Sequence, residues 1–177
     1  MSTKAALVML NVLGGIAVLG SYAWGLRQPE VAAGLWGHVP ESLRGLYTVN
    51  MLLAAAGYFP FSGLLVLACD EARFRAEASL PYGPTLLSLY ASVLLPSALW
   101  LPLTSVMIAS PDTLLWLAIR IDLALVGLGA LGILMVCVRI ARARGGVLAW
   151  SAVAGALPFV LQTAVLDALI WPYYWFG

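Results

Sequence analysis

Three ionisable side chains lie inside long apolar stretches of the sequence, where a charge is costly to bury. They are Arg120, Asp122 and Asp167. In a membrane-like environment such groups usually face a partner, a ligand or a water-filled cavity. Arg120 and Asp122 are two residues apart, so on a helix they point about 200° apart and cannot share one partner. We therefore expect Arg120 to pair with Asp167 or with a ligand carboxylate. An ion pair that only fixes helix packing is the alternative.

Further polar and aromatic side chains lie in the same half of these apolar stretches. Aromatic faces can stack a flat apolar molecule, while a few polar groups orient it. Prolines at positions 60, 96, 102 and 158 would kink their helices and separate them locally. The sequence thus predicts a ligand-binding site, and its expected lining residues are Tyr47, Asn50, Trp100, Thr104, Asp122 and Asp167.

Residues for several common chemistries are missing or isolated. The one histidine, His38, lies in a predicted connection, so a histidine-built metal site or a bis-histidine haem is not expected within one chain. Cys69 and Cys137 lack further ligands that would complete a metal set, and we interpret them as reduced structural thiols. No H-E-x-x-H, P-loop or serine-triad spacing occurs. We therefore expect no catalysis, no metal and no resident cofactor.

The elements that must position these residues are apolar helices. Of 177 residues, 63% are hydrophobic and 10% charged, which is too little polar surface for a water-soluble globule. Backbone amides in hydrocarbon must bond within their own segment, so the apolar runs predict helices. We expect an all-α, polytopic five-transmembrane-helix bundle, a single membrane domain over 1–177. Its predicted spans are 5–26, 46–68, 85–109, 113–138 and 147–170.

The ends and turns of these spans carry further signals. The first run lacks a small-residue cleavage site before Tyr22, so we expect a retained helix and not a removed signal peptide. Ser110, Pro111 and Asp112 predict a tight turn, with Ser110 capping the fourth span and Pro111 at its first position. The third and fourth spans should therefore form an antiparallel hairpin.

The positive charges predict an orientation. With five spans, the side that carries the N-terminus also carries six cations, namely Lys4, Arg73, Arg75, Arg139, Arg142 and Arg144. The opposite side carries Arg27 and Arg44. This asymmetry places the N-terminus in the cytoplasm and the C-terminus across the membrane, which we expect to be a bacterial inner membrane. The lipid bilayer is the expected partner, and a net charge of +1 argues against nucleic-acid binding.

Residues of the third and fourth spans also suggest a family. Leu89 and Tyr90 are followed ten residues on by Trp100 and then Pro102, and Asp122 lies on the next span. This pattern resembles the TspO/MBR family, the tryptophan-rich sensory or translocator proteins. Further matching positions on the second span are Gly45, Leu46, Tyr47, Met51, Gly57 and Tyr58. The resemblance implies a pocket for tetrapyrroles, sterols or similar flat hydrophobic molecules, closed by the first connection, with transport or sensing as its output.

The sequence leaves more than one function open. The first hypothesis is a protein that binds or carries a hydrophobic small molecule in the outer half of the bundle, the half nearer the C-terminus. The second is a non-catalytic accessory subunit of a larger membrane complex, in which stripes of small residues contact partner helices. The same stripes are compatible with a homodimer. A proton or ion carrier that uses Asp122 and Asp167 ranks third.

Overall fold

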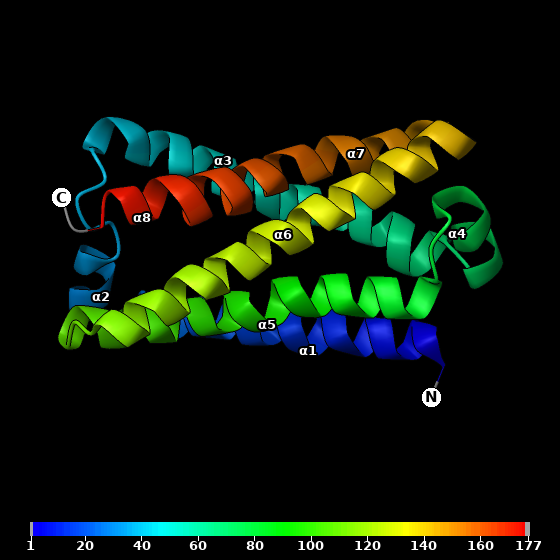
Figure 1. The fold of residues 1–177 in the computed structure, drawn as a ribbon. Helices are drawn as coiled ribbons and strands as arrows, with labels where there is room; N and C mark the ends of the chain where they lie inside the picture. The colour runs from blue at the N-terminus through cyan, green and yellow to red at the C-terminus, as the bar shows by residue number, and fades with distance from the viewer. Residues whose placement is uncertain (1, 176–177) are drawn as a thin grey trace.

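The computed structural model describes residues 2–175, and within that range all regular structure is helical. Five helices are long and apolar enough to cross a membrane: Thr3–Gly25, Glu41–Ala68, Tyr82–Ala109, Thr113–Arg144 and Val147–Tyr173. The predicted all-α five-helix bundle is therefore confirmed. The two ends of the chain lie at opposite ends of the bundle (Figure 1), and we call these ends the N-terminal side and the C-terminal side.

Several elements extend beyond the apolar runs from which they were predicted. The third span begins at Tyr82 and the fourth continues to Arg144, because a helix can continue in polar sequence after the apolar run ends. Two connections also contain short helices, α2 and α4. The elements in chain order are α1 (Thr3–Gly25), α2 (Pro29–Gly34), α3 (Glu41–Ser62), η1 (Gly63–Ala68), α4 (Glu71–Ala78), α5 (Tyr82–Ala109), α6 (Thr113–Arg144), α7 (Val147–Val160), η2 (Leu161–Ile170) and α8 (Trp171–Tyr173).

The helices form two pairs that α6 joins. Helix α1 packs along α5, and α3 packs along α7, while α6 contacts α5 on one side and α7 with η2 on the other. In Figure 1, α6 crosses the view diagonally between the two pairs. Helix α1 reaches the second span through η1, at the N-terminal side. On the C-terminal side, buried residues of α3, α5, α6, η2 and α8 pack into one hydrophobic cluster.

Proline changes the geometry of the second and fifth spans. Both η1 and η2 are π-helical, and each begins three residues after a proline inside an α-helix, Pro60 in the first case and Pro158 in the second. A proline removes one amide donor, and π-helical turns often mark functional positions. The π-helix η2 carries Asp167, so this residue projects from an irregular part of its span.

The turn between α5 and α6 corrects one prediction. Asp112 is the N-cap of α6, and its Oδ1 accepts a hydrogen bond of 2.9 Å from the amide of Leu115. Ser110 instead ends α5, and Pro111 lies outside α6. An aspartate caps as well as a serine and also complements the positive helix end. The predicted antiparallel contact between the two helices is present.

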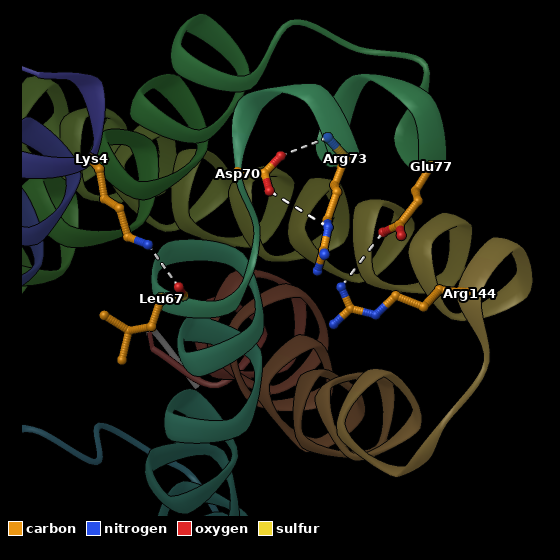
Figure 2. A network of polar contacts seen from close by, with 6 residues as sticks. All are labelled: Lys4, Leu67, Asp70, Arg73, Glu77 and Arg144. Atoms are coloured by element: carbon orange, nitrogen blue, oxygen red, sulfur yellow. Dashed lines mark hydrogen bonds and ion pairs between the residues drawn. The ribbon is translucent and has the colours of Figure 1, made fainter.

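Polar contacts tie the N-terminal side together (Figure 2). Lys4 donates to the carbonyl oxygen of Leu67 at 2.7 Å. Asp70 caps α4 by accepting from the Arg73 amide at 2.8 Å and also pairs with the Arg73 side chain at 3.6 Å. Arg144 pairs with Glu77 at 3.8 Å, so the end of α6 is joined to α4.

Candidate ligand-binding site

An aromatic cluster occupies the C-terminal side of the bundle, with Trp171 at its centre. The Trp171 ring lies 5.8 Å from the rings of both Trp100 and Trp116, and 4.6 Å from that of Trp175. Trp100 also meets Tyr22 of α1 at 5.8 Å. Trp171 begins α8, and the other rings come from α1, α5, α6 and the segment after α8. One residue at the end of the fifth span thus contacts rings of α5 and α6, and Trp100 extends the cluster to α1.

The first connection is fastened to the residues that follow the fifth span. The indole Nε1 of Trp171 donates to the Leu35 carbonyl oxygen at 2.9 Å. The His38 amide donates to the Tyr174 carbonyl oxygen at 2.9 Å. Trp36 packs edge-on against Tyr47 with ring centres 5.8 Å apart. These contacts hold α2 and the turn after it over the aromatic cluster.

A chain of hydrogen bonds links α3 to η2 beside this cluster. Asn50 Nδ2 donates to the Pro158 carbonyl oxygen at 3.0 Å and to Gln162 Oε1 at 3.1 Å. Gln162 Nε2 in turn donates to Asp167 Oδ1 at 2.8 Å. The Tyr47 hydroxyl donates to the Leu166 carbonyl oxygen at 2.8 Å. Three of the residues predicted to line the site, Tyr47, Asn50 and Asp167, are therefore brought together at η2. Gln162 connects Asn50 to Asp167.

The predicted ion pair between Arg120 and Asp167 is wrong. Arg120 is exposed on the surface of α6, whereas the Asp167 carboxylate accepts from Gln162. No carboxylate among residues 2–175 pairs with Arg120. The reason is the face of α6 that turns inward. Ile119, Asp122 and Leu123 are buried, and Arg120 is about 200° from Asp122 on the helix, so it must point away from the bundle.

The remaining predicted residues carry polar atoms without partners. Trp100 Nε1, Thr104 Oγ1 and Asp122 Oδ2 are each buried and make no hydrogen bond within the described residues. Thr104 is fully buried, and Asp122 is 7% exposed. Trp100 and Asp122 stand equally far from Pro111 on antiparallel helices, roughly 16 Å along each at about 1.5 Å per residue. A buried polar atom without a partner costs about 1 to 3 kcal/mol, so the three atoms call for a physical explanation.

Charge and ring contacts place Asp167 and Trp100 near the same tyrosine. The Asp167 carboxyl is close enough to the Tyr22 and Tyr47 hydroxyls to interact with them electrostatically. Tyr22 also contacts the ring of Trp100. Tyr22 therefore interacts with both parts of the site, with Asp167 of η2 through charge and with the Trp100 ring of α5 through contact. The site can offer ring faces for stacking, an N–H and a hydroxyl to a bound molecule, and carboxylates that accept hydrogen bonds.

Two contributors to the site were missed as site residues from the sequence, Tyr22 and Trp171. Tryptophan and tyrosine near a span end usually lie at the membrane surface, so the positions of these two residues do not by themselves indicate a binding site. The W-P-Y-Y-W sequence over 171–175 could have indicated more, since its spacing places two tryptophans one turn apart. The sequence also predicted no role for Gln162, which lies five residues before Asp167 and donates a hydrogen bond to it.

Two hollows in the surface lie away from the aromatic cluster. One, of about 540 Å³, runs along the first half of α1, from Ser2 to Leu13. The other, of about 560 Å³, lies between the end of α4 and the end of α6. Among residues 2–175, no group of three or more His, Cys, Asp or Glu residues is placed to hold a metal ion. The tryptophan rings of the aromatic cluster pack against buried residues of α3, α5, α6 and η2, and the first connection is fastened over them.

The fold and this cluster define a multi-pass α-helical membrane protein with polar and aromatic groups gathered on the C-terminal side. No family model, curated protein or solved structure matches the chain. Inference about its function therefore rests on the geometry of its own residues.

Proposed function

We propose that the protein binds or carries an apolar small molecule, sterol-like or tetrapyrrole-like, at the aromatic cluster on the C-terminal side. The observation that carries this proposal is the set of buried, unpartnered atoms Trp100 Nε1, Thr104 Oγ1 and Asp122 Oδ2. A ligand hydroxyl can accept a hydrogen bond from Trp100 Nε1 and donate one to Thr104 Oγ1 or Asp122 Oδ2, and the surrounding rings would bury the ligand's apolar body. The resemblance to the TspO/MBR family supports the same ligand classes.

The charges favour a ligand that donates hydrogen bonds. Neither Asp122 nor Asp167 has a cationic partner among the described residues. A ligand carboxylate at this site would meet two further carboxyls and no arginine, which makes it unfavourable. A sterol brings a single hydroxyl, whereas a tetrapyrrole brings carboxylates together with its pyrrole N–H groups. The sterol-like class is therefore the better match.

Entry of a ligand requires the first connection to move. The aromatic cluster is held closed by the hydrogen bonds from Trp171 to Leu35 and from His38 to Tyr174. Each such bond contributes only about 1 kcal/mol, so thermal opening of α2 is a feasible route. When the ligand binds, its contacts with Trp100 replace those that Trp171 and Tyr22 make with this ring.

Fluorescence titration of the purified protein in nanodiscs tests the function. Tryptophan emission is measured against protoporphyrin IX, which quenches it, and against dehydroergosterol, which accepts energy from it. We expect saturable binding, weakened about three- to tenfold by Thr104→Val or Asp122→Asn. Trp150→Phe, which alters an exposed tryptophan at the start of α7, is the matched control for Trp100→Phe. Signals that do not saturate with either probe, or Trp100→Phe binding as tightly as Trp150→Phe, would contradict the proposal.

One observation favours the second candidate, an accessory subunit of a larger complex. Arg120 is exposed on α6 about 10 Å from the start of the helix, among exposed Leu114, Leu117 and Ile121. An arginine facing lipid is unfavourable by about 2.5 to 3.5 kcal/mol at the centre of a span, less where its side chain reaches the interface. A carboxylate on a partner helix would remove this penalty.

Gentle detergent extraction separates the two candidates. Co-purification of another protein in fixed stoichiometry, lost in Arg120→Gln but kept in Arg27→Gln, supports the accessory subunit. Arg27 is a suitable control because it is exposed at the same side but outside the spans. Extraction as a monomer or homodimer that Arg120→Gln does not change supports the ligand-binding function.

We further propose that the N-terminal side faces the cytoplasm of a bacterial cell. The support is the unequal distribution of cations, because α4 and the end of α6 carry five of the six cations at that side. A membrane-impermeant maleimide applied to intact spheroplasts tests it. Glu30→Cys should label and Ala76→Cys should label only after lysis, and the reverse pattern would contradict the orientation. Both positions are exposed, and the native cysteines are buried.

A further inference from the structure

The hollow at the N-terminal side lies between two segments that are far apart in the sequence. The end of α4 contributes Glu77, Ala78 and Ser79, and the last turns of α6 contribute Arg139, Arg142 and Ala143. Its volume is about 560 Å³. It is at the opposite end of the bundle from the aromatic cluster, so its role is independent of the proposed function.

The charges around this hollow do not balance. Glu77 is the one carboxylate in its lining, and it pairs with Arg144 at 3.8 Å (Figure 2). Arg139 Nη1 donates to the Ala78 carbonyl oxygen at 3.2 Å, and neither Arg139 nor Arg142 pairs with a carboxylate among residues 2–175. The hollow therefore carries two guanidinium groups whose charge is not compensated.

A backbone carbonyl holds the guanidinium group of Arg139 in place, and Ser79 adds a hydroxyl to the hollow. The hydrogen bond to Ala78 holds the Arg139 guanidinium against the end of α4 and leaves its other N–H groups unused within the described residues. Ser79 ends α4 with φ 57°, in the left-handed region, and lies in the lining of the hollow. Two planar guanidinium groups and a hydroxyl match the oxygen atoms of a phosphate, since arginine binds phosphate through paired N–H donors.

An apolar stripe continues from the arginines along the same face of α6. Met135, Leu131 and Leu128 follow Arg139 at intervals of three or four residues, and their side chains are 45 to 65% exposed. Residues at these intervals lie above one another on a helix. A molecule whose phosphate lies at Arg139 and Arg142 can therefore extend an alkyl chain over roughly 16 Å of α6 toward the middle of the span.

We propose that this hollow binds the phosphate of an anionic phospholipid, whose acyl chains lie along the exposed face of α6. Basic pockets between helices at a membrane surface recognise such headgroups. A zwitterionic lipid fits less well, because its ammonium group needs an anion and Glu77 already pairs with Arg144. The apolar stripe distinguishes the lipid from free phosphate as the source of this chemistry.

Native mass spectrometry of the purified full chain tests this proposal. Phosphatidylglycerol and phosphatidylcholine with the same acyl chains are compared on the wild type, on Arg139→Gln/Arg142→Gln and on Arg73→Gln/Arg75→Gln. The second double variant removes the same charge from α4, from residues outside the hollow. We expect the wild type to prefer phosphatidylglycerol and the first variant to bind it about thirtyfold more weakly, because each arginine that faces the headgroup in the hollow contributes a roughly fivefold factor. The control should change it less than about threefold.

Two further measurements keep the test decisive if the first variant folds poorly. Arg139→Lys/Arg142→Lys retains the charge but loses the paired N–H donors, so an intermediate loss of phosphatidylglycerol is expected. Inorganic phosphate is added to the wild type as a competitor. Displacement of the lipid by millimolar phosphate would assign the hollow to a soluble phosphate and overturn the lipid. Equal binding of the two lipids, or an equal loss in the α4 control, would overturn the site itself.

Discussion

Gly57 of α3 and Gly155 of α7 bring the backbones of these two helices into direct contact. A Cβ atom on either glycine would meet backbone atoms of the other. Both lie in the pattern A-x-A-G-x-x-P-F, over 54–61 and 152–159, and a π-helix begins just beyond each copy. The helices run in opposite directions, so the two copies face each other across the contact. This repeat escapes a search for fixed-period repeats because it is short and occurs twice, almost a hundred residues apart.

Gly57→Ala should destabilise the protein by about 1 to 3 kcal/mol, because α3 and α7 would have to separate to admit the methyl group. Gly45→Ala is the matched control in the same helix, since a Cβ there meets nothing within 4 Å. The control should be neutral or slightly stabilising, as alanine favours a helix more than glycine does. Thermal unfolding in detergent, followed by loss of helical circular dichroism, measures both. Equal effects of the two substitutions would show that the contact is not close-packed.

Asn50 and Gln162 should show energetic coupling. Asn50→Leu and Gln162→Leu each remove hydrogen bonds between α3 and η2, at about 1 kcal/mol each, a typical value within membranes. Because the two side chains share a bond of 3.1 Å, the double variant should lose less than the sum of the singles, by about 0.5 kcal/mol or more. Denaturation of all four proteins in mixed micelles gives the cycle. Strict additivity would mean that the bond does not persist.

Arg120→Gln should lower the unfolding free energy by less than about 0.5 kcal/mol or raise it, because its side chain is exposed and unpaired within the described residues and a charge that faces lipid is unfavourable. Loss of one partner from a buried pair would cost about 3 to 5 kcal/mol. Arg144→Gln serves as the comparison, since its half-buried contact with Glu77 joins α6 to α4. It should destabilise the protein more than Arg120→Gln does. A larger loss of stability in Arg120→Gln than in Arg144→Gln would indicate that Arg120 has a buried partner, as in the predicted ion pair with Asp167.

Cys69 should react slowly with maleimide while the protein is folded. Its side chain is buried, and burial raises the pKa of the Cys69 thiol, with the charge of Arg144 opposing the shift. A raised pKa lowers the thiolate fraction at pH 7 to 8, and the thiolate is the reactive form. Labelling should therefore speed up at higher pH and on unfolding. Mass spectrometry compares the wild type with Ala76→Cys, and equal labelling of the two at pH 7 would contradict the burial of Cys69.

The five spans could be predicted because their signal is physical and long. About twenty apolar residues are needed to cross the hydrocarbon, and each of the five runs has them. The helices α2 and α4 could not be predicted in the same way, since six or eight residues in a polar connection carry no such signal. The sequence offers both Ser110 and Asp112 as suitable N-cap residues for α6, and only the structure selects Asp112.

For the candidate site, the sequence predicted which half of each span the residues occupy, but not which face of each helix turns inward. The sequence placed Tyr47, Asn50 and Asp167 in the same half of their apolar stretches, and the structure joins them through η2. It could not indicate which face of α6 turns inward. That choice depends on packing against α5, α7 and η2, and it buries Asp122 while leaving Arg120 outside. Contacts between distant segments, such as Trp171 with Trp100, likewise depend on the arrangement of whole helices.

The bond between Trp171 and Leu35 also sets an order for biosynthesis. Its two ends are 136 residues apart, and Trp171 follows the last of the five spans. A ribosome that has just delivered α2 to the membrane has not yet made the residue that anchors it. The segment that covers the aromatic cluster therefore lacks this anchor until the fifth span has been made, so the cover can close only at the end of synthesis.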